Sequence, residues 1–96
     1  MLALTDRAVE AVREIVASSG EDAETGGLRL TAERAGTQAS FKLRVVPLPA
    51  EDDAVIEDGG VRVFLEPEAA SLLDDKLLDA TVDQSQVAFT VVDQTS

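Results

Sequence analysis

The sequence predicts an α+β protein with a single domain, in which helices and strands occupy separate segments. Residues 8–16 carry apolar side chains at helical spacing, and several short segments alternate apolar and polar residues. A chain of 96 residues has room for one core, which must be aliphatic because Phe41, Phe64 and Phe89 are its only aromatic residues. We expect one domain over residues 1–96, with a twisted, mostly antiparallel β structure, an N-terminal helix and a second short helix.

The first helix is predicted over about residues 5–19. Thr5 suits the N-cap position, Asp6 suits the positive N-terminal end, and Gly20 permits the helix to stop. The apolar stripe of this helix consists of Ala8, Val9, Val12, Ile15 and Val16. Such a stripe needs a sheet to cover it.

Four strands are predicted next, over about residues 28–33, 39–46, 54–57 and 61–65. The second alternates clearly, with the apolar residues from Phe41 to Val45 on one face and Lys42 and Arg44 on the other. Asp58-Gly59-Gly60 separates the third strand from the fourth and predicts a tight hairpin, because glycine accepts the positive φ of such turns.

A second helix is predicted over about residues 67–75, with Pro67 at its first position. Asp74 and Asp75 should end it, because acidic side chains oppose the negative C-terminal end of a helix. Two further strands follow over about residues 77–82 and 87–92.

The composition excludes most catalytic and metal chemistry. The chain contains no cysteine, histidine, tyrosine or tryptophan. Disulfides, zinc sites, thiolate-bound clusters and imidazole acid/base catalysis all need one of the first two residue types. Lys42 and Lys76, the only lysines, lie where a polar surface is expected. We therefore expect no enzyme activity, no catalytic residue, no cofactor-binding residue and no metal ligand.

Charge is unevenly distributed along the chain. Residues 1–46 carry six basic and seven acidic groups, a net charge of −1, whereas residues 47–96 carry two basic and twelve acidic groups, a net charge of −10. This excludes an evident nucleic-acid or anionic-membrane surface, because phosphate binding needs clustered Lys and Arg. A protein partner is the expectation, and the candidate surface consists of Asp74, Asp75, Asp79 and Asp83.

Two other interpretations of these acids stay open. They can simply be solvated side chains that keep a small protein in solution. Carboxylates can also attract hard cations such as calcium, magnesium or ferric iron, although no calcium-loop signature occurs here. Without a basic leader or a long apolar run, the chain is expected to be cytoplasmic, as a monomer or homodimer.

Most of the chain resembles the A-type iron–sulfur cluster carriers, also called HesB-like or IscA-like proteins. Two segments carry most of the resemblance, the strand Gly27-Leu28-Arg29-Leu30 and the acidic hairpin from Asp53 to Val63. The other landmarks are Ala8 to Ile15, Gly36, Phe41-Lys42-Leu43, Leu72-Leu73-Asp74, Leu78-Asp79 and Phe89. The resemblance implies a compact fold in which a helix packs on a twisted β structure.

The chain departs from the family at its cluster ligands. The resemblance implies three cysteines, one in a Gly-Cys-Ser-Gly motif and two in a Cys-Gly-Cys motif near the C-terminus. The first motif reads Gly36-Thr37-Gln38-Ala39 here, and we expect the segment with the other two, after Phe89, to be missing. Neither a hydroxyl nor an amide replaces a thiolate on cluster iron.

These observations favour a non-catalytic accessory or interaction protein related to iron–sulfur cluster assembly, which cannot hold a cluster through its own cysteines. Its partner would be a protein, with the iron–sulfur assembly machinery as the first candidate. The alternative is a repurposed small acidic binding module unrelated to iron–sulfur metabolism, because a fold does not fix a function. A carboxylate iron-binding protein is a third hypothesis.

Overall fold

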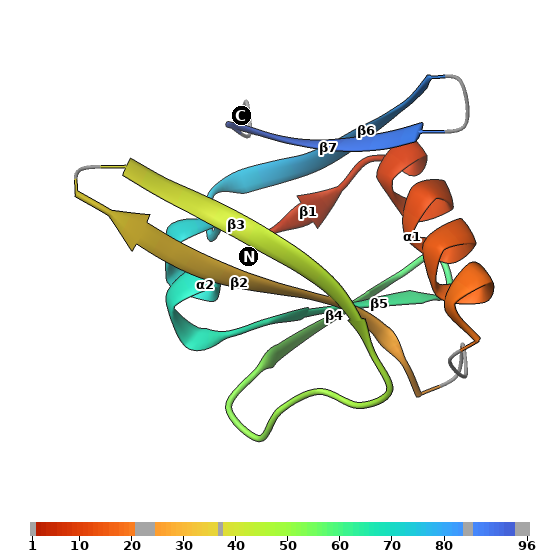
Figure 1. The fold of residues 1–96 in the computed structure, drawn as a ribbon, viewed down its shortest axis with the longest axis horizontal. Coiled ribbons are helices and arrows are strands. Elements are labelled where there is room, and N and C mark those ends of the chain that lie inside the picture. Colours follow the sequence, from red (N-terminus) through yellow and green to blue (C-terminus); the bar gives the residue numbers. More distant parts are fainter. Residues whose placement is uncertain (1, 21–24, 37, 84–85, 94–96) are drawn as a thin grey trace.

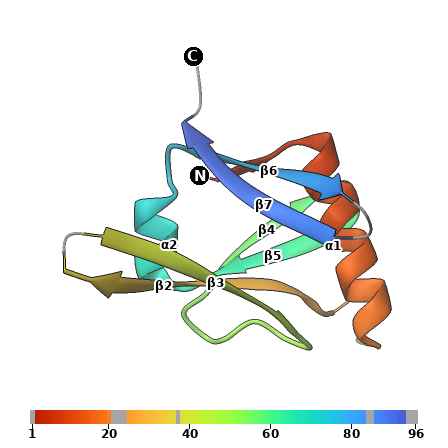
Figure 2. The same ribbon diagram turned by 45° about the horizontal axis from the view of Figure 1, so that its top comes forward.

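The computed structural model describes residues 2–20, 25–36, 38–83 and 86–93. The elements are β1 (Ala3–Leu4), α1 (Asp6–Ser19), β2 (Gly27–Ala35), β3 (Gln38–Val46), β4 (Ala54–Asp58), β5 (Val61–Leu65), α2 (Pro67–Leu72), β6 (Lys76–Asp83) and β7 (Gln86–Asp93). The strands form two sheets, with the orders β1-β6-β7 and β3-β2-β5-β4. Figures 1 and 2 show α1 and α2 at opposite ends of the two sheets.

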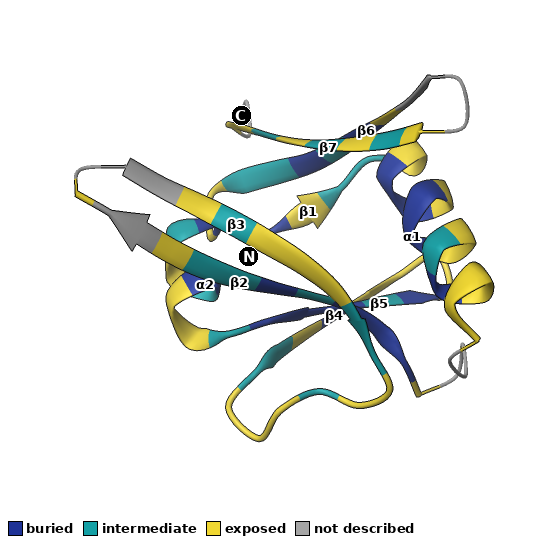
Figure 3. Ribbon diagram, in the orientation of Figure 1, coloured by how far each residue is buried: buried dark blue, intermediate teal, exposed yellow. Residues whose placement is uncertain are grey.

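The β structure is mostly antiparallel, as predicted. The pairs β2–β3, β4–β5 and β6–β7 are antiparallel, whereas β1–β6 and β2–β5 are parallel. The two sheets enclose the core, to which α1, β2, β5 and β6 contribute most of the buried side chains (Figure 3). Val12, Leu30 and Val63 are at most 1% exposed. Burying each such side chain contributes about 1.5–3 kcal/mol to folding.

Phe64 is buried outside this main core. It alternates along β5 with Val63 and Leu65, which belong to the core, so its ring lies on the opposite face of the four-stranded sheet. Its side chain is nevertheless 0% exposed. Its register partners on that outer face are Arg29 of β2 and Val55 of β4. The outer face of this sheet is therefore partly covered and is not wholly a solvent surface.

Helix α1 forms where the sequence predicts it, because both of its ends carry suitable residues. Thr5 is the N-cap, and its hydroxyl accepts a 3.1 Å hydrogen bond from the backbone N–H of Ala8. Gly20 ends the helix in the left-handed conformation, with φ of 85°. The helix packs mainly on β6, and its predicted apolar stripe is buried except for Ile15, which is partly buried against the core.

The predicted glycine hairpin is confirmed. Asp58 and Val61 pair at the end of β4 and the start of β5, so Gly59 and Gly60 form a two-residue turn. Both glycines have positive φ, 59° and 84°. The Arg13 guanidinium of α1 donates a hydrogen bond to the Gly59 carbonyl oxygen, which ties the helix to the turn.

Two boundaries differ from the prediction. Strand β1 lies outside every predicted element, because two residues are too few to show a period. It is a strand through its pairing with β6. The predicted helix 67–75 is too long, since α2 ends at Leu72. The Leu73 N–H still bonds the Ala69 carbonyl, after which Asp74 and Asp75 form a turn and Lys76 begins β6. The acids therefore stop the helix about one turn earlier than expected.

Candidate functional site

The four acids of the predicted partner surface occupy two different settings. Asp74 and Asp75 lie in the turn between α2 and β6, and both are exposed. A carboxylate oxygen of Asp75 is 3.4 Å from the Lys76 ammonium nitrogen. Lys76 also pairs with Asp93 of β7, and this hydrogen bond is the main cause that raises its pKa. The turn thus presents two neighbouring carboxylates beside one cation.

Asp79 is partly buried and is bonded within the chain. One of its carboxylate oxygens accepts a 2.7 Å hydrogen bond from the Thr5 hydroxyl and a 2.8 Å bond from the Ala80 backbone N–H. The other oxygen accepts a 2.8 Å bond from Arg7. The Thr5 hydrogen bond is the largest cause that lowers the Asp79 pKa. These donors assign Asp79 a structural role, because its carboxylate fixes the start of α1 to β6.

Asp83 is the last residue of β6, where it pairs with Gln86 of β7. Its side chain lies outside the described part of the structure. The exposed part of the predicted surface therefore centres on Asp74 and Asp75.

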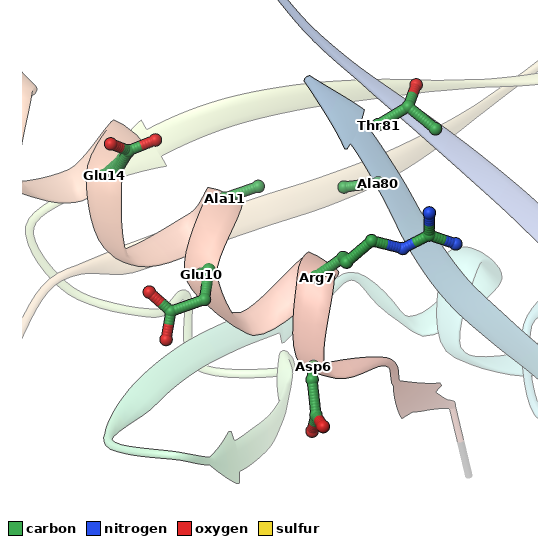
Figure 4. A pocket seen from close by; sticks show the side chains of 7 residues that line it. All are labelled: Asp6, Arg7, Glu10, Ala11, Glu14, Ala80 and Thr81. Atoms are coloured by element: carbon green, nitrogen blue, oxygen red, sulfur yellow. The ribbon is translucent and has the colours of Figure 1, made fainter.

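A groove of about 530 Å³ runs between α1 and β6 and is also rich in acids. Its lining consists of Asp6, Arg7, Glu10, Ala11, Glu14, Ala80 and Thr81. Figure 4 shows the two alanines on facing sides of the groove, whereas Asp6 and Glu10 point away from β6. The carboxylates border the groove and do not converge in it. Among the described residues, no group of three or more acidic side chains is arranged to hold a metal ion.

The segment that the resemblance aligns with the first cysteine motif connects β2 to β3. Gly36 has φ of 64°, so the chain turns there through a conformation that favours glycine. Thr37, which stands at the cysteine position, lies outside the described residues. Whatever its placement, a threonine hydroxyl supplies no thiolate.

The protein is a small α+β protein with two sheets and a capped helix that packs on β6. It has no thiol or imidazole side chain to serve as a ligand of a metal cofactor. The chain belongs to the iron–sulphur cluster biosynthesis family, whose model matches residues 1–94. It is 31% identical over 91 residues to an uncharacterized protein of Bradyrhizobium diazoefficiens, an alignment that covers 94% of this chain and 84% of the relative.

Solved structures of similar proteins confirm the fold. Escherichia coli SufA, described as involved in biosynthesis of iron–sulfur clusters, superposes with a TM-score of 0.78 and 26% identity, over 96% of this chain and 79% of SufA. IscA, solved with a [2Fe-2S] cluster, superposes with a TM-score of 0.76 and 22% identity, over 97% of this chain and 85% of IscA. At that lower identity the likeness to IscA concerns the fold alone. Within the described residues, neither helix is long and apolar enough to cross a membrane.

Proposed function

We propose that this protein is a non-catalytic accessory protein of iron–sulfur cluster assembly, which contacts another protein and holds no cluster through its own side chains. The observation that carries the proposal is the combination of family membership with a sequence that has no cysteine and no histidine. Cluster iron is bound by thiolates and, in some centres, by imidazoles. In any complex that contains a cluster, the partner would have to supply every such ligand.

The exposed turn of Asp74 and Asp75 is the proposed contact. Net charge supports it, because ten of the eleven excess negative charges belong to residues 47–96. Complementary charge mainly speeds association and orients the partner, so the expected partner presents a basic surface. Asp79 is left out of the contact because its side chain is only 23% exposed, against 81% for Asp75, and both of its carboxylate oxygens accept hydrogen bonds within the chain. Asp83 stays a residue to test, and the proposed location is the cytoplasm.

Binding to purified proteins tests the docking. The chain is mixed in turn with a cysteine desulfurase, a scaffold protein and SufA, and complexes are measured by native mass spectrometry and biolayer interferometry. We expect one of these proteins to bind and the affinity to fall as salt rises. Failure of all three, with the fold intact, would contradict the accessory role and favour a repurposed small binding module.

Paired charge reversals locate the contact. Asp74→Lys with Asp75→Lys should weaken the complex, whereas Glu51→Lys with Asp52→Lys changes two equally adjacent, exposed acids in the loop before β4 and should not. Both variants change net charge by the same amount, so a general electrostatic effect would weaken both alike. Equal weakening would remove the surface assignment while leaving the docking itself intact.

Anaerobic reconstitution with iron and sulfide tests whether the isolated chain can hold an iron–sulfur cluster. We expect no visible absorbance of an iron–sulfur cluster on the isolated chain, because it has no thiolate. A stable cluster on the isolated chain would contradict the proposal. Stoichiometric iron binding in calorimetry, without sulfide, would instead support the carboxylate iron-binding hypothesis.

A further inference from the structure

Basic side chains gather on the outer face of β2 and β3. Arg29 of β2 pairs in register with Arg44 of β3, and Thr31 pairs with Lys42. Along β2, Arg29 and Thr31 alternate with Leu28 and Leu30, which are buried in the core. Arg29, Thr31 and their partners on β3 therefore lie on the side of the sheet that faces away from the core. Together with Leu43 they line a hollow of about 340 Å³. Three of the eight Lys and Arg residues thus meet at one hollow in a chain of net charge −11.

Arg29 is fixed at the border of the hollow. Its Nε donates to Asp53 at 2.7 Å and its Nη2 donates to the other carboxylate oxygen at 3.0 Å. The Asp53 side chain is 0% exposed, and this hydrogen-bonded pair is the main cause that raises the Arg29 pKa and lowers the Asp53 pKa. Nη1 of Arg29 lies outside the pair. The ion pair therefore holds Arg29 rigidly and neutralises most of its charge.

The other two cations are available. Lys42 contacts Glu33 at 3.0 Å, but both side chains are more than half exposed, and such pairs contribute little. Among the residues that the structure describes, Arg44 has no hydrogen-bond or ion-pair partner. It lies directly opposite Arg29 in the register, and because Asp53 already pairs with Arg29, the charge of Arg44 is the uncompensated one at this position.

We propose that this hollow binds a small multivalent oxyanion, namely a phosphate group or a polycarboxylate. The Arg44 guanidinium and the Lys42 ammonium supply the charged donors, and the Thr31 hydroxyl supplies a neutral one. Charge-assisted bonds from guanidinium groups to carboxylate or phosphate are among the stronger hydrogen bonds in proteins. A volume of about 340 Å³ lies within the range of small-molecule sites and exceeds what one such anion needs.

Net charge favours a small anion over an acidic protein. An acidic protein would meet the repulsion of the whole chain, whose residues 47–96 carry twelve carboxylates. Screening limits the range of exposed charges to about 8 Å at physiological ionic strength. An ion seated in the hollow is therefore governed by the charges beside it, which are Arg44, Lys42 with its exposed partner Glu33, and Arg29 paired with Asp53. This inference does not depend on a protein partner, so it stands or falls separately from the proposed function.

Backbone amide NMR tests the site. Inorganic phosphate and citrate are titrated separately into the labelled chain, against sodium chloride at matched ionic strength. We expect saturable shifts at the amides of Thr31, Lys42 and Arg44 with phosphate or citrate but not with chloride. Shifts that never saturate, or that chloride reproduces, would overturn the proposal.

Three variants identify the donors. Arg44→Gln should weaken binding about tenfold or more, the effect of losing one charge-assisted contact. Arg62→Gln is the matched control, because Arg62 is also a strand arginine but pairs with Glu57, 2.9 Å away, and does not line the hollow. Glu33→Gln should tighten binding, because it releases Lys42.

The variants also separate this site from the alternatives. Equal weakening by Arg44→Gln and Arg62→Gln would show that net charge alone attracts the anion and would overturn the proposal. Binding of a glutamate-rich peptide at the same amides, without binding of phosphate or citrate, would also overturn it in favour of an acidic protein partner. Thermal unfolding of each variant checks that the fold is intact.

Discussion

Thr5 links the start of α1 to a strand far along the chain. Its hydroxyl accepts the hydrogen bond from Ala8 and donates its own hydrogen to Asp79. The sequence predicts the cap, because threonine before an amphipathic stripe is a standard helix start. It does not predict the carboxylate, which is 74 residues away and reaches Thr5 only because β6 packs beside α1. The sequence alone therefore does not show that the Asp79 carboxylate accepts hydrogen bonds within the chain.

Thr5→Ala should lower the free energy of unfolding by about 1 kcal/mol, because it removes the N-cap acceptor. Thr5→Ser keeps a hydroxyl in the same place and should retain most of the stability. Urea unfolding followed by circular dichroism measures both variants. If serine proves as costly as alanine, the hydroxyl is not what stabilises this helix end.

The Arg29–Asp53 pair should make stability depend on pH in a defined direction. The Asp53 pKa is lowered in the folded state, so its contribution is complete above the unfolded pKa of about 3.9 and is lost as pH falls through the folded value. Asp53→Asn should therefore cost about 2 kcal/mol at pH 7 and progressively less below about pH 4. Urea unfolding across this pH range measures the difference. A difference that stays constant with pH would contradict this role.

Some elements can be predicted from the period of their own residues, whereas others depend on contacts with distant parts of the chain. The hairpin of β4 and β5 and the alternation of β3 follow from local residue patterns, and the structure confirms them. Strand β1 has no such signal, because it depends on a neighbour far along the chain. The two acids after α2 do predict that the helix ends, but they do not fix the residue at which it ends. Local sequence thus predicts elements with their own period and misses those made by their neighbours.

The β4–β5 turn allows a matched pair of glycine substitutions. A Cβ on Gly59 would lie 2.6 Å from a Val9 methyl carbon of α1, whereas a Cβ on Gly60 would meet nothing within 4 Å. Both positions have positive φ, so alanine is strained at each by about 1 kcal/mol. Gly59→Ala should therefore destabilise the protein more than Gly60→Ala in urea unfolding. Equal costs would show that α1 moves aside freely.

Across the whole molecule, negative charge should dominate the response to salt. At a net charge of −11 the folded chain repels itself, and the unfolded chain does so less because its charges lie farther apart. Raising sodium chloride from low to physiological concentration should therefore raise the thermal midpoint. A gain of about 1 kcal/mol would appear as roughly 4–8 °C in a domain of this size. A lower midpoint would show that the surface ion pairs contribute more than the overall repulsion costs.

The sequence predicts some features of the candidate sites, whereas others depend on how the strands pair. The exposure of Asp74 and Asp75 and the outward direction of Lys42 and Arg44 could be predicted from their positions. The meeting of Arg44 with Arg29 could not, because it depends on the register between β2 and β3. That register is set by which side chains enter the core, and a slip of either strand by one residue would turn the arginine of that strand inward.

The parallel pairing of β1 with β6 has a consequence for how the protein folds. Ala3 and Leu4 find their partners only at Leu77 and Leu78, so this contact closes a loop of more than seventy residues. Closing such a loop is entropically costly, and proteins rich in distant contacts fold slowly. During synthesis, the first residues must wait until β6 has left the ribosome before they can dock. Until β1 docks, the edge of β6 that it covers stays unpaired, and unpaired strand edges can pair with other chains.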